Sequence, residues 1–214
     1  MDTQILELVV RFFVLTVSLT IHEASHAGSA YYLGDDTSAR MGRLSLNPLV
    51  HMDPLGSLMI LMGMPIGWAK PVPVNPFRFK DMRRDMALVS FAGPASNLVL
   101  GALFCFIFFA TNTVIMGTSW VQIILLFVHM NFALAVFNLL PLYPLDGSKV
   151  LPLLLPGKLA SRYEEAIARF SYWPLMILVL MESFTSRGPL RLWFELWGPV
   201  LSPIYRIFGV PSYW

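Results

Sequence analysis

The stretch Ile5–His26, ILELVVRFFVLTVSLTIHEASH, decides the fold of this chain. Before its first histidine it carries only two charges, Glu7 and Arg11. An apolar run of about 20 residues is long enough to cross a bilayer as a helix. We therefore predict a first transmembrane helix over residues 5–33, with both histidines toward its C-terminal end.

The composition of the whole chain also indicates a membrane protein. Of its 214 residues, 56% are hydrophobic and 13% are charged, whereas a soluble domain carries about 25% charged residues. We predict a single membrane-embedded domain over residues 1–214, with a core at 5–155 and accessory helices at 156–214. The net charge of +2 includes no basic run that would indicate nucleic-acid binding. A single cysteine, Cys105, excludes a disulfide framework and a Cys-rich metal site.

Further apolar runs predict more spans. Residues 86–110 and 119–140 are each long enough to cross the bilayer. Residues 170–181 form a weaker span, and the aromatic tail at 188–214 either spans again or lies at the interface. The predicted fold class is an all-α polytopic membrane protein with four to six transmembrane helices.

A small membrane-associated element is expected directly after the first helix. Residues 39–46 alternate roughly between polar and apolar side chains, which favours a short β-hairpin. Residues 55–69 are apolar but short and contain glycines and a proline. They fit a re-entrant loop or a short buried helix better than a span.

The distribution of basic residues predicts the topology. Loop 70–85 is the most basic segment, so we expect it to be cytoplasmic. The span at 86–110 then leaves the cytoplasm and the span at 119–140 returns, which places Asp146 inside. If 55–69 does not cross, the histidine pair lies near the same cytoplasmic side. If 55–69 crosses, the pair and Asp146 are separated.

His22-Glu23-Ala24-Ser25-His26 carries the first sign of chemistry. Residues four apart share one helix face, so His22 and His26 can offer two imidazoles to one metal ion. Glu23 lies one step around the helix, where it can act on a water molecule. This H-E-x-x-H spacing is typical of zinc proteases. Ionisable groups inside an apolar helix are costly and usually functional.

A catalytic zinc site usually has three protein ligands and one open position. The candidates for the third ligand are the acidic and histidine residues in apolar surroundings: His51, Asp53, His129, Asp146 and Glu182. Asp146 is favoured because Pro141 and Pro144 break the preceding helix and Gly147 permits close backbone approach. Its alternative role is to cap the short helix that follows.

Four motifs in order resemble the site-2 protease family of intramembrane zinc metalloproteases. They are His22-Glu23-x-x-His26, Asn47-Pro48-x-x-His51-x-Asp53-Pro54-x-Gly56, Ala92-Gly93-Pro94-Ala95-Ser96-Asn97 and Asn138-x-x-Pro141-x-x-Pro144-Leu145-Asp146-Gly147. The resemblance covers roughly residues 10–155, and the second and third motifs resemble the compact prokaryotic branch. Some relatives carry a PDZ or CBS domain. We identify neither here, so we expect control to come from elsewhere, such as a regulatory membrane partner.

The resemblance implies a role for each matching residue. His22, His26 and Asp146 would hold one Zn²⁺ per chain, and Glu23 would be the general base. The substrate would be a transmembrane protein cleaved in regulated intramembrane proteolysis, with the active site toward the cytoplasmic side of the cell membrane. Ligand type alone does not exclude cobalt or iron.

The substrate contacts are less well defined by the motifs. Asn97, Asn131 and Asn138 are candidates for binding the substrate backbone or the oxyanion, and His51 is a candidate substrate-side group. Asn97 can instead be a polar contact between helices, and Gly93-Pro94 can be a packing and kink site. The hairpin edge is a candidate for holding substrate by strand addition.

Two classes of function remain open. The first is an enzyme that cleaves membrane segments. The second is a membrane metalloprotein that carries metal or binds clients without cutting them. A carrier needs metal ligands but no general base beside them, so Glu23 favours the enzyme.

Overall fold

The computed structural model describes residues 3–62, 68–111, 118–185 and 188–211, and these are almost entirely helical. The helices are α1 (Thr3–Tyr32), α2 (Thr37–Arg40), α3 (Pro54–Leu61), α4 (Met82–Thr111), α5 (Thr118–Asn138), α6 (Gly147–Leu154), α7 (Gly157–Phe170), α8 (Trp173–Phe184) and α9 (Pro189–Ile207), with short 3₁₀ turns η1 (Pro48–Val50) and η2 (Pro76–Arg78). The prediction of an all-α fold is confirmed.

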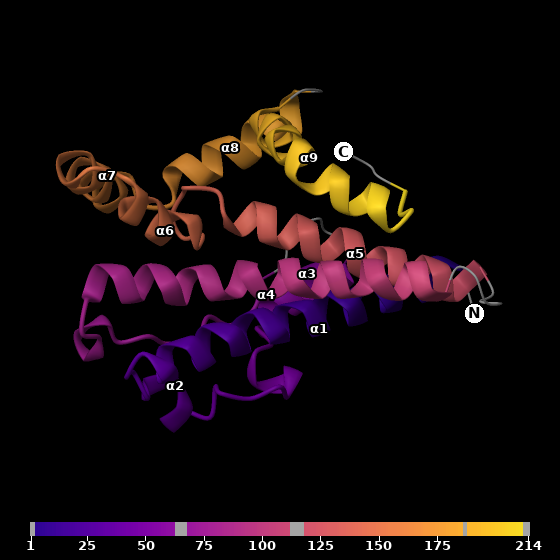
Figure 1. Cartoon of the computed structure of the whole chain (residues 1–214), viewed down its shortest axis with the longest axis horizontal. Coiled ribbons are helices and arrows are strands. Elements are labelled where there is room, and N and C mark those ends of the chain that lie inside the picture. Colours follow the sequence, from indigo (N-terminus) through magenta and orange to yellow (C-terminus); the bar gives the residue numbers. More distant parts are fainter. Residues whose placement is uncertain (1–2, 63–67, 112–117, 186–187, 212–214) are drawn as a thin grey trace.

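Three of the described helices, α1, α4 and α5, are long and apolar enough to cross a membrane. They lie side by side, and α4 runs opposite to α1 and α5 (Figure 1). The C-terminal ends of α1 and α5 therefore point to the same side of the bundle. This direction agrees with the predicted topology in which the histidine pair and Asp146 meet.

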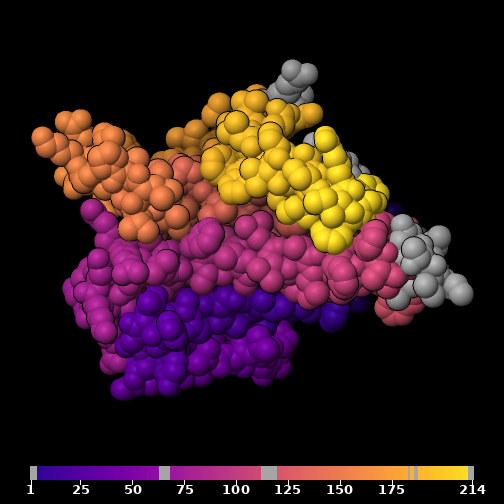
Figure 2. All heavy atoms as spheres, viewed as in Figure 1, coloured from indigo at the N-terminus to yellow at the C-terminus, as the bar shows by residue number. Residues whose placement is uncertain are grey.

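The prediction of four to six spans is not supported by the described residues. The expected fourth span is α8, which has 12 residues and extends about 18 Å at 1.5 Å per residue, well short of an apolar core of about 30 Å. The tail helix α9 is longer but contains Pro199 and Pro203. Its residues Leu201 and Tyr205 pack on the α4–α5 core, and Figure 2 shows this C-terminal region lying over α5.

The β-hairpin predicted at 39–46 is wrong, and the described residues contain no regular strand. The chain there forms the single-turn helix α2 and then Gly42, whose φ of +69° is a left-handed conformation that favours glycine. Arg43 breaks the assumed alternation because its side chain points inward. The buried guanidinium donates to the carbonyls of Val50, Lys70 and Pro71.

The segment at 55–69, for which we predicted a re-entrant loop or a short buried helix, contains most of the short helix α3. The side chain of Asp53 caps α3 by accepting the N–H groups of Leu55 and Gly56 at 3.0 and 2.9 Å. Gly56 lets the backbone of Trp68 pass directly against α3, where a Cβ atom would collide with it. Helix α3 has eight residues and is too short to span, although residues 63–67 of the predicted segment lie outside the described residues.

Candidate active site

The structure brings one of the candidate third ligands to the histidine pair. The Nε2 atoms of His22 and His26 lie 3.0 Å apart. Oδ2 of Asp146 lies 3.2 Å from the first and 3.3 Å from the second. All three side chains are almost completely buried, and together they form a group that could hold a metal ion.

This triangle fits a zinc ion. Tetrahedral zinc with bonds of about 2.0–2.1 Å separates its ligand atoms by about 3.3–3.4 Å. The three separations of 3.0 to 3.3 Å are close to that value. Two imidazoles and one carboxylate also form a donor set that zinc takes in catalytic sites, with a fourth position left for water or substrate.

Asp146 lies at the start of α6 but does not cap it. Its side chain makes no capping hydrogen bond and turns instead toward the histidines. Gly147 makes this turn feasible, because a Cβ atom there would collide with the backbone of Leu139. Burial acts to raise the pKa of the Asp146 carboxyl, but the nearby rings of His26 and His22 outweigh it and lower the pKa. The neighbouring histidine rings therefore favour the ionised carboxylate, which is the form that could bind a metal ion.

Each histidine is oriented through its second ring nitrogen. Nδ1 of His26 lies 2.7 Å from the carbonyl oxygen of Val89 on α4. Nδ1 of His22 lies 2.6 Å from Oδ1 of Asn97, also on α4. Contacts of this kind fix the ring of a metal-binding histidine and direct Nε2 at the ion.

Gly93 allows α4 to approach this closely. A Cβ atom at this position would lie 2.5 Å from His26 Nε2 and 2.6 Å from His22 Nε2. Sequence reasoning left Gly93 between a kink site and a functional one. The structure places it against both ligand atoms, and its sequence signal was the Gly-Pro pair inside a spanning helix.

Glu23 is half-buried beside the histidines and has an unpredicted partner. Its Oε2 accepts the backbone N–H of Val72 at 3.0 Å. Val72 belongs to residues 69–75, which we call the strap. Pro71 and Pro73 flank it and have no N–H, so Val72 is the single amide donor in this part of the strap.

The strap is tied down on both sides of Val72. The Lys70 N–H donates to the carbonyl of His51 at 2.7 Å, and the Asn75 N–H donates to Oδ2 of Asp35 at 2.7 Å. Burial acts to raise the pKa of the Asp35 carboxyl, but hydrogen bonds from Thr37 and Asn75, with the Arg78 guanidinium, outweigh it and lower the pKa. Asp35 therefore anchors the strap as a carboxylate.

The other predicted site residues lie outside the histidine–aspartate cluster, and each has its own surroundings. Asn97 is fully buried behind His22. Asn138 is half-buried, and its amide donates to the carbonyl of Leu134 in its own helix. His51 is 2% exposed; its Nε2 lies 2.8 Å from the carbonyl of Ser45, and its Nδ1 is buried with no hydrogen-bond partner among the described residues.

The remaining candidates for a third ligand are engaged elsewhere. Asp53 caps α3. His129 contacts the carbonyls of Leu125 and Pro211. Glu182 accepts the N–H of Leu190.

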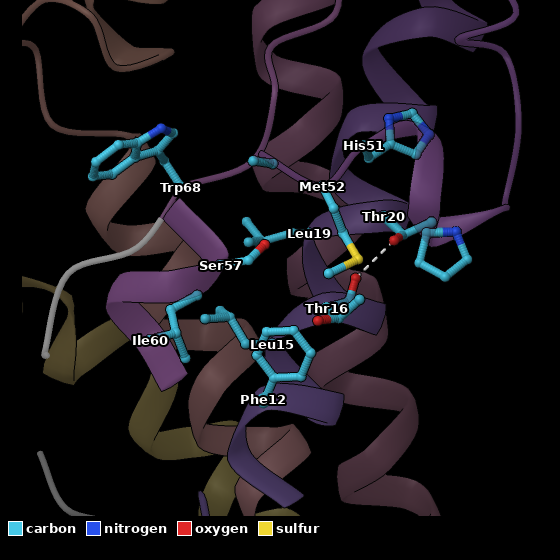
Figure 3. A pocket seen from close by; sticks show the side chains of 12 residues that line it. Phe12, Leu15, Thr16, Leu19, Thr20, His51, Met52, Ser57, Ile60 and Trp68 are labelled. Carbon is cyan, nitrogen blue, oxygen red and sulfur yellow. Dashed lines mark hydrogen bonds between the residues drawn. The ribbon is translucent and has the colours of Figure 1, made fainter. Parts of the chain in front are cut away.

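A mostly apolar pocket lies between α1 and α3 (Figure 3). From α1 it is lined by Phe12, Leu15, Thr16, Leu19 and Thr20, and from the following elements by Pro48, His51, Met52, Ser57, Ile60, Trp68 and Ala69. On α1, Thr20 lies four residues after Thr16, and Glu23 lies three residues after Thr20. The pocket therefore lies on the face of α1 that carries Glu23.

The chain is similar to a known peptidase family and to curated relatives. The description "Peptidase family M50" matches residues 111–179, a stretch that contains Asp146 but not the histidine pair. "Putative zinc metalloprotease YwhC" of Bacillus subtilis (strain 168) is 40% identical over 84% of this chain and 82% of its own length.

Two mycobacterial relatives extend the match. "Putative zinc metalloprotease Rip2" of Mycolicibacterium smegmatis is 32% identical over 92% of this chain and 73% of its own length. The protein of the same name from Mycobacterium tuberculosis (strain H37Rv) is 32% identical over 77% and 63%. No solved structure matches the chain. The fold, the histidine–aspartate cluster and these relatives together show that the chain belongs to peptidase family M50, the site-2 protease family of zinc metalloproteases.

Proposed function

We propose that this chain is an intramembrane zinc endopeptidase that hydrolyses peptide bonds within or near transmembrane segments of membrane-protein substrates. The observation that carries the proposal is the position of Glu23 beside a three-ligand cluster on a helix long enough to span. Glu23 and the two histidines of the cluster share this apolar helix. The substrate must therefore reach the site from the bilayer or its surface.

His22, His26 and Asp146 would hold one Zn²⁺ per chain. Zinc held there would polarise the scissile carbonyl and lower the pKa of the attacking water toward 7. Glu23 would take the proton of that water at Oε1, because Oε2 already accepts the Val72 N–H. It would then give the proton to the leaving amine.

The substrate backbone has two candidate partners in the chain. His51 donates from Nε2 to Ser45, so its buried Nδ1 is left as an acceptor. A peptide N–H entering the pocket of Figure 3 would satisfy it. Asn138, at the end of α5, remains a predicted oxyanion or backbone contact. We also propose that the active site lies toward the cytoplasmic side. The basic loop 70–85, which we expect to be cytoplasmic, lies at the same end of the bundle as Asp146.

The test is cleavage by purified protein in detergent, compared with Glu23→Gln. Both proteins would be assayed for metal content and incubated with a panel of single-pass membrane segments. We expect the parent to cleave at least one segment and Glu23→Gln to cleave none, with about one zinc per chain retained in both.

The alternative, a membrane metal carrier, predicts a different result. A carrier would bind zinc equally in both proteins and cleave no segment. Equal cleavage by parent and Glu23→Gln would instead overturn the assignment of the base.

A further inference from the structure

We propose that Ser18, Asn131 and Asn97 form a hydrogen-bond relay that fixes the tautomer of His22. Among the described residues, no side-chain hydrogen bond joins Asn131 or Ser18 to the proposed metal ligands or to Glu23, so they would be positioning residues. Asn131 comes from α5, Asn97 from α4 and Ser18 from α1, and all three are fully buried. The relay therefore joins the three spanning helices at one point.

The orientation of the Asn97 amide is set by its neighbours. Its Nδ2 donates to the backbone carbonyl of Ser18 at 3.3 Å and to Oδ1 of Asn131 at 2.8 Å. A backbone carbonyl can only accept, so the atom of Asn97 that faces it must be the nitrogen. Oδ1 of Asn97 then faces His22 Nδ1 at 2.6 Å.

Asn131 is fixed in the same way. Its Nδ2 donates to the carbonyl of Phe127 at 2.8 Å and to Oγ of Ser18 at 3.0 Å. Oγ of Ser18 in turn donates to the carbonyl of Val14 at 2.8 Å. If the Asn97 amide were flipped, its oxygen would face the carbonyl of Ser18 and Oδ1 of Asn131, which are both acceptors. Flipping Asn131 as well would relieve only the second of these clashes. That second flip would set an oxygen against Phe127.

The relay leaves His22 one tautomer. Because Asn97 presents an oxygen, Nδ1 of His22 must carry a proton, and in the neutral ring Nε2 then carries the lone pair. That lone pair points at the space shared with His26 and Asp146. His26 reaches the same state directly, through the carbonyl of Val89. One histidine is thus fixed by backbone and the other by a relay of side chains.

A purely structural role would act differently. Polar side chains between membrane helices stabilise packing through hydrogen bonds across the helices. Such a contribution would lower the unfolding stability without distinguishing His22 from His26. A relay changes His22 alone, and its effect falls with distance from the ring.

The test is ¹⁵N-histidine NMR of the metal-free protein in detergent, at a pH where both rings are neutral. Resonances would be assigned by single His→Gln variants. We expect the Nδ1–H tautomer for His22 and His26 in the parent. Asn131→Leu should give His22 a clear Nε2–H population and leave His26 unchanged. Val128→Ala, buried one turn away on α5 and without a polar group, should change neither.

Zinc affinity from chelator competition is the second readout. Loss of a partner that orients a ligand typically costs about 10–100-fold in metal affinity. We expect a loss of that size for Asn97→Leu, roughly 3–10-fold for Asn131→Leu, and less for Ser18→Ala. Val128→Ala should bind zinc as the parent does.

An unchanged His22 tautomer in Asn131→Leu, or equal shifts of both histidines, would overturn the relay. If Asn131→Leu does not fold, Asn131→Ala decides, because it also removes the oxygen that accepts the Asn97 Nδ2 and adds neither bulk nor charge. The inference rests on the proposed metal site for its consequence. Since the tautomer is measured without metal or substrate, it can fail while the protease proposal stands, or the reverse.

Discussion

The two halves of the site are built in different ways. One half is carried by helices: His22 and His26 on α1 are oriented by groups of α4, Asn97 and the carbonyl of Val89. The other half is carried by irregular segments. Asp146 follows the broken end of α5, and the strap that contacts Glu23 crosses between α3 and α4.

This difference shows which features hold each half of the site in position. The helical half depends on the 3.6-residue repeat, on a close helix crossing at Gly93 and on buried contacts to Asn97 and Val89. The irregular half needs separate anchors. The Tyr163 hydroxyl donates to the carbonyl of Pro141 at 2.9 Å, and Asp35 holds Asn75 of the strap. Changes to the helical half should therefore abolish the site, and changes to these anchors should loosen it.

The strongest expected effect comes from Gly93→Ala. The new methyl group would lie within 2.6 Å of both histidine Nε2 atoms, so the ligands cannot keep their positions. We expect zinc content near zero after dialysis, and no cleavage. Gly101→Ala is the matched control on the same helix, because its methyl group would be nearest the ring of Phe132, at 2.9 Å, and not a histidine. Equal zinc loss in both variants would show that α4 is merely intolerant of alanine.

Asp146→Asn tests the carboxylate that we propose as the third zinc ligand, which the irregular half supplies. The amide keeps the shape of the carboxylate but loses its charge, while the histidine pair stays intact. We expect zinc affinity to fall by more than the roughly 100-fold upper range of indirect partners, measured by chelator competition. Affinity equal to that of the parent would mean that another group completes the site.

Val72→Pro tests the contact between the strap and Glu23. Proline removes the N–H that Glu23 accepts, whereas Val72→Ala shortens the side chain and keeps that N–H. A positioned general base accelerates a reaction by about 10²–10⁴-fold. We expect Val72→Pro to misplace Glu23 and so to lower kcat by about tenfold. Zinc content should be unchanged in both variants. A similar loss in Val72→Ala would assign the effect to the side chain.

The smallest effect is expected from Tyr163→Phe. The variant removes the hydroxyl that ties α7 to the segment before Asp146. Burial raises the pKa of Tyr163 to about 12, so the hydroxyl remains a donor throughout the neutral range. We expect a loss of a few-fold in zinc affinity, below the range of groups that contact a ligand directly. Tyr31→Phe, which removes an exposed hydroxyl, should have none.

The same division decides what could be predicted from sequence. Apolar length predicted α1, α4 and α5 to within four residues at each end, and the four-residue spacing predicted the His22–His26 pair. Asp146 could be predicted because prolines and a glycine mark the break after α5.

The contacts of the irregular half could not be predicted, for physical reasons. Glu23 and Val72 are 49 residues apart, and their contact depends on strap anchors that no local pattern encodes. The alternation at 39–46 predicted the wrong structure because it counts Arg43 as an outward-facing polar residue. Its guanidinium instead points inward and donates to three backbone carbonyls. The Asn97 contacts depend on how α4 and α5 are rotated against α1, which periodicity alone does not fix.

The most direct test of the account is zinc K-edge X-ray absorption of the purified protein. We expect a first shell of nitrogen and oxygen at about 2.0–2.1 Å with no sulfur, and outer-shell scattering from two imidazoles. The imidazole signal should be kept in Asp146→Asn and halved in His26→Ala. A third imidazole, or an imidazole signal that stays unchanged in His26→Ala, would contradict a site built from the α1 pair and Asp146.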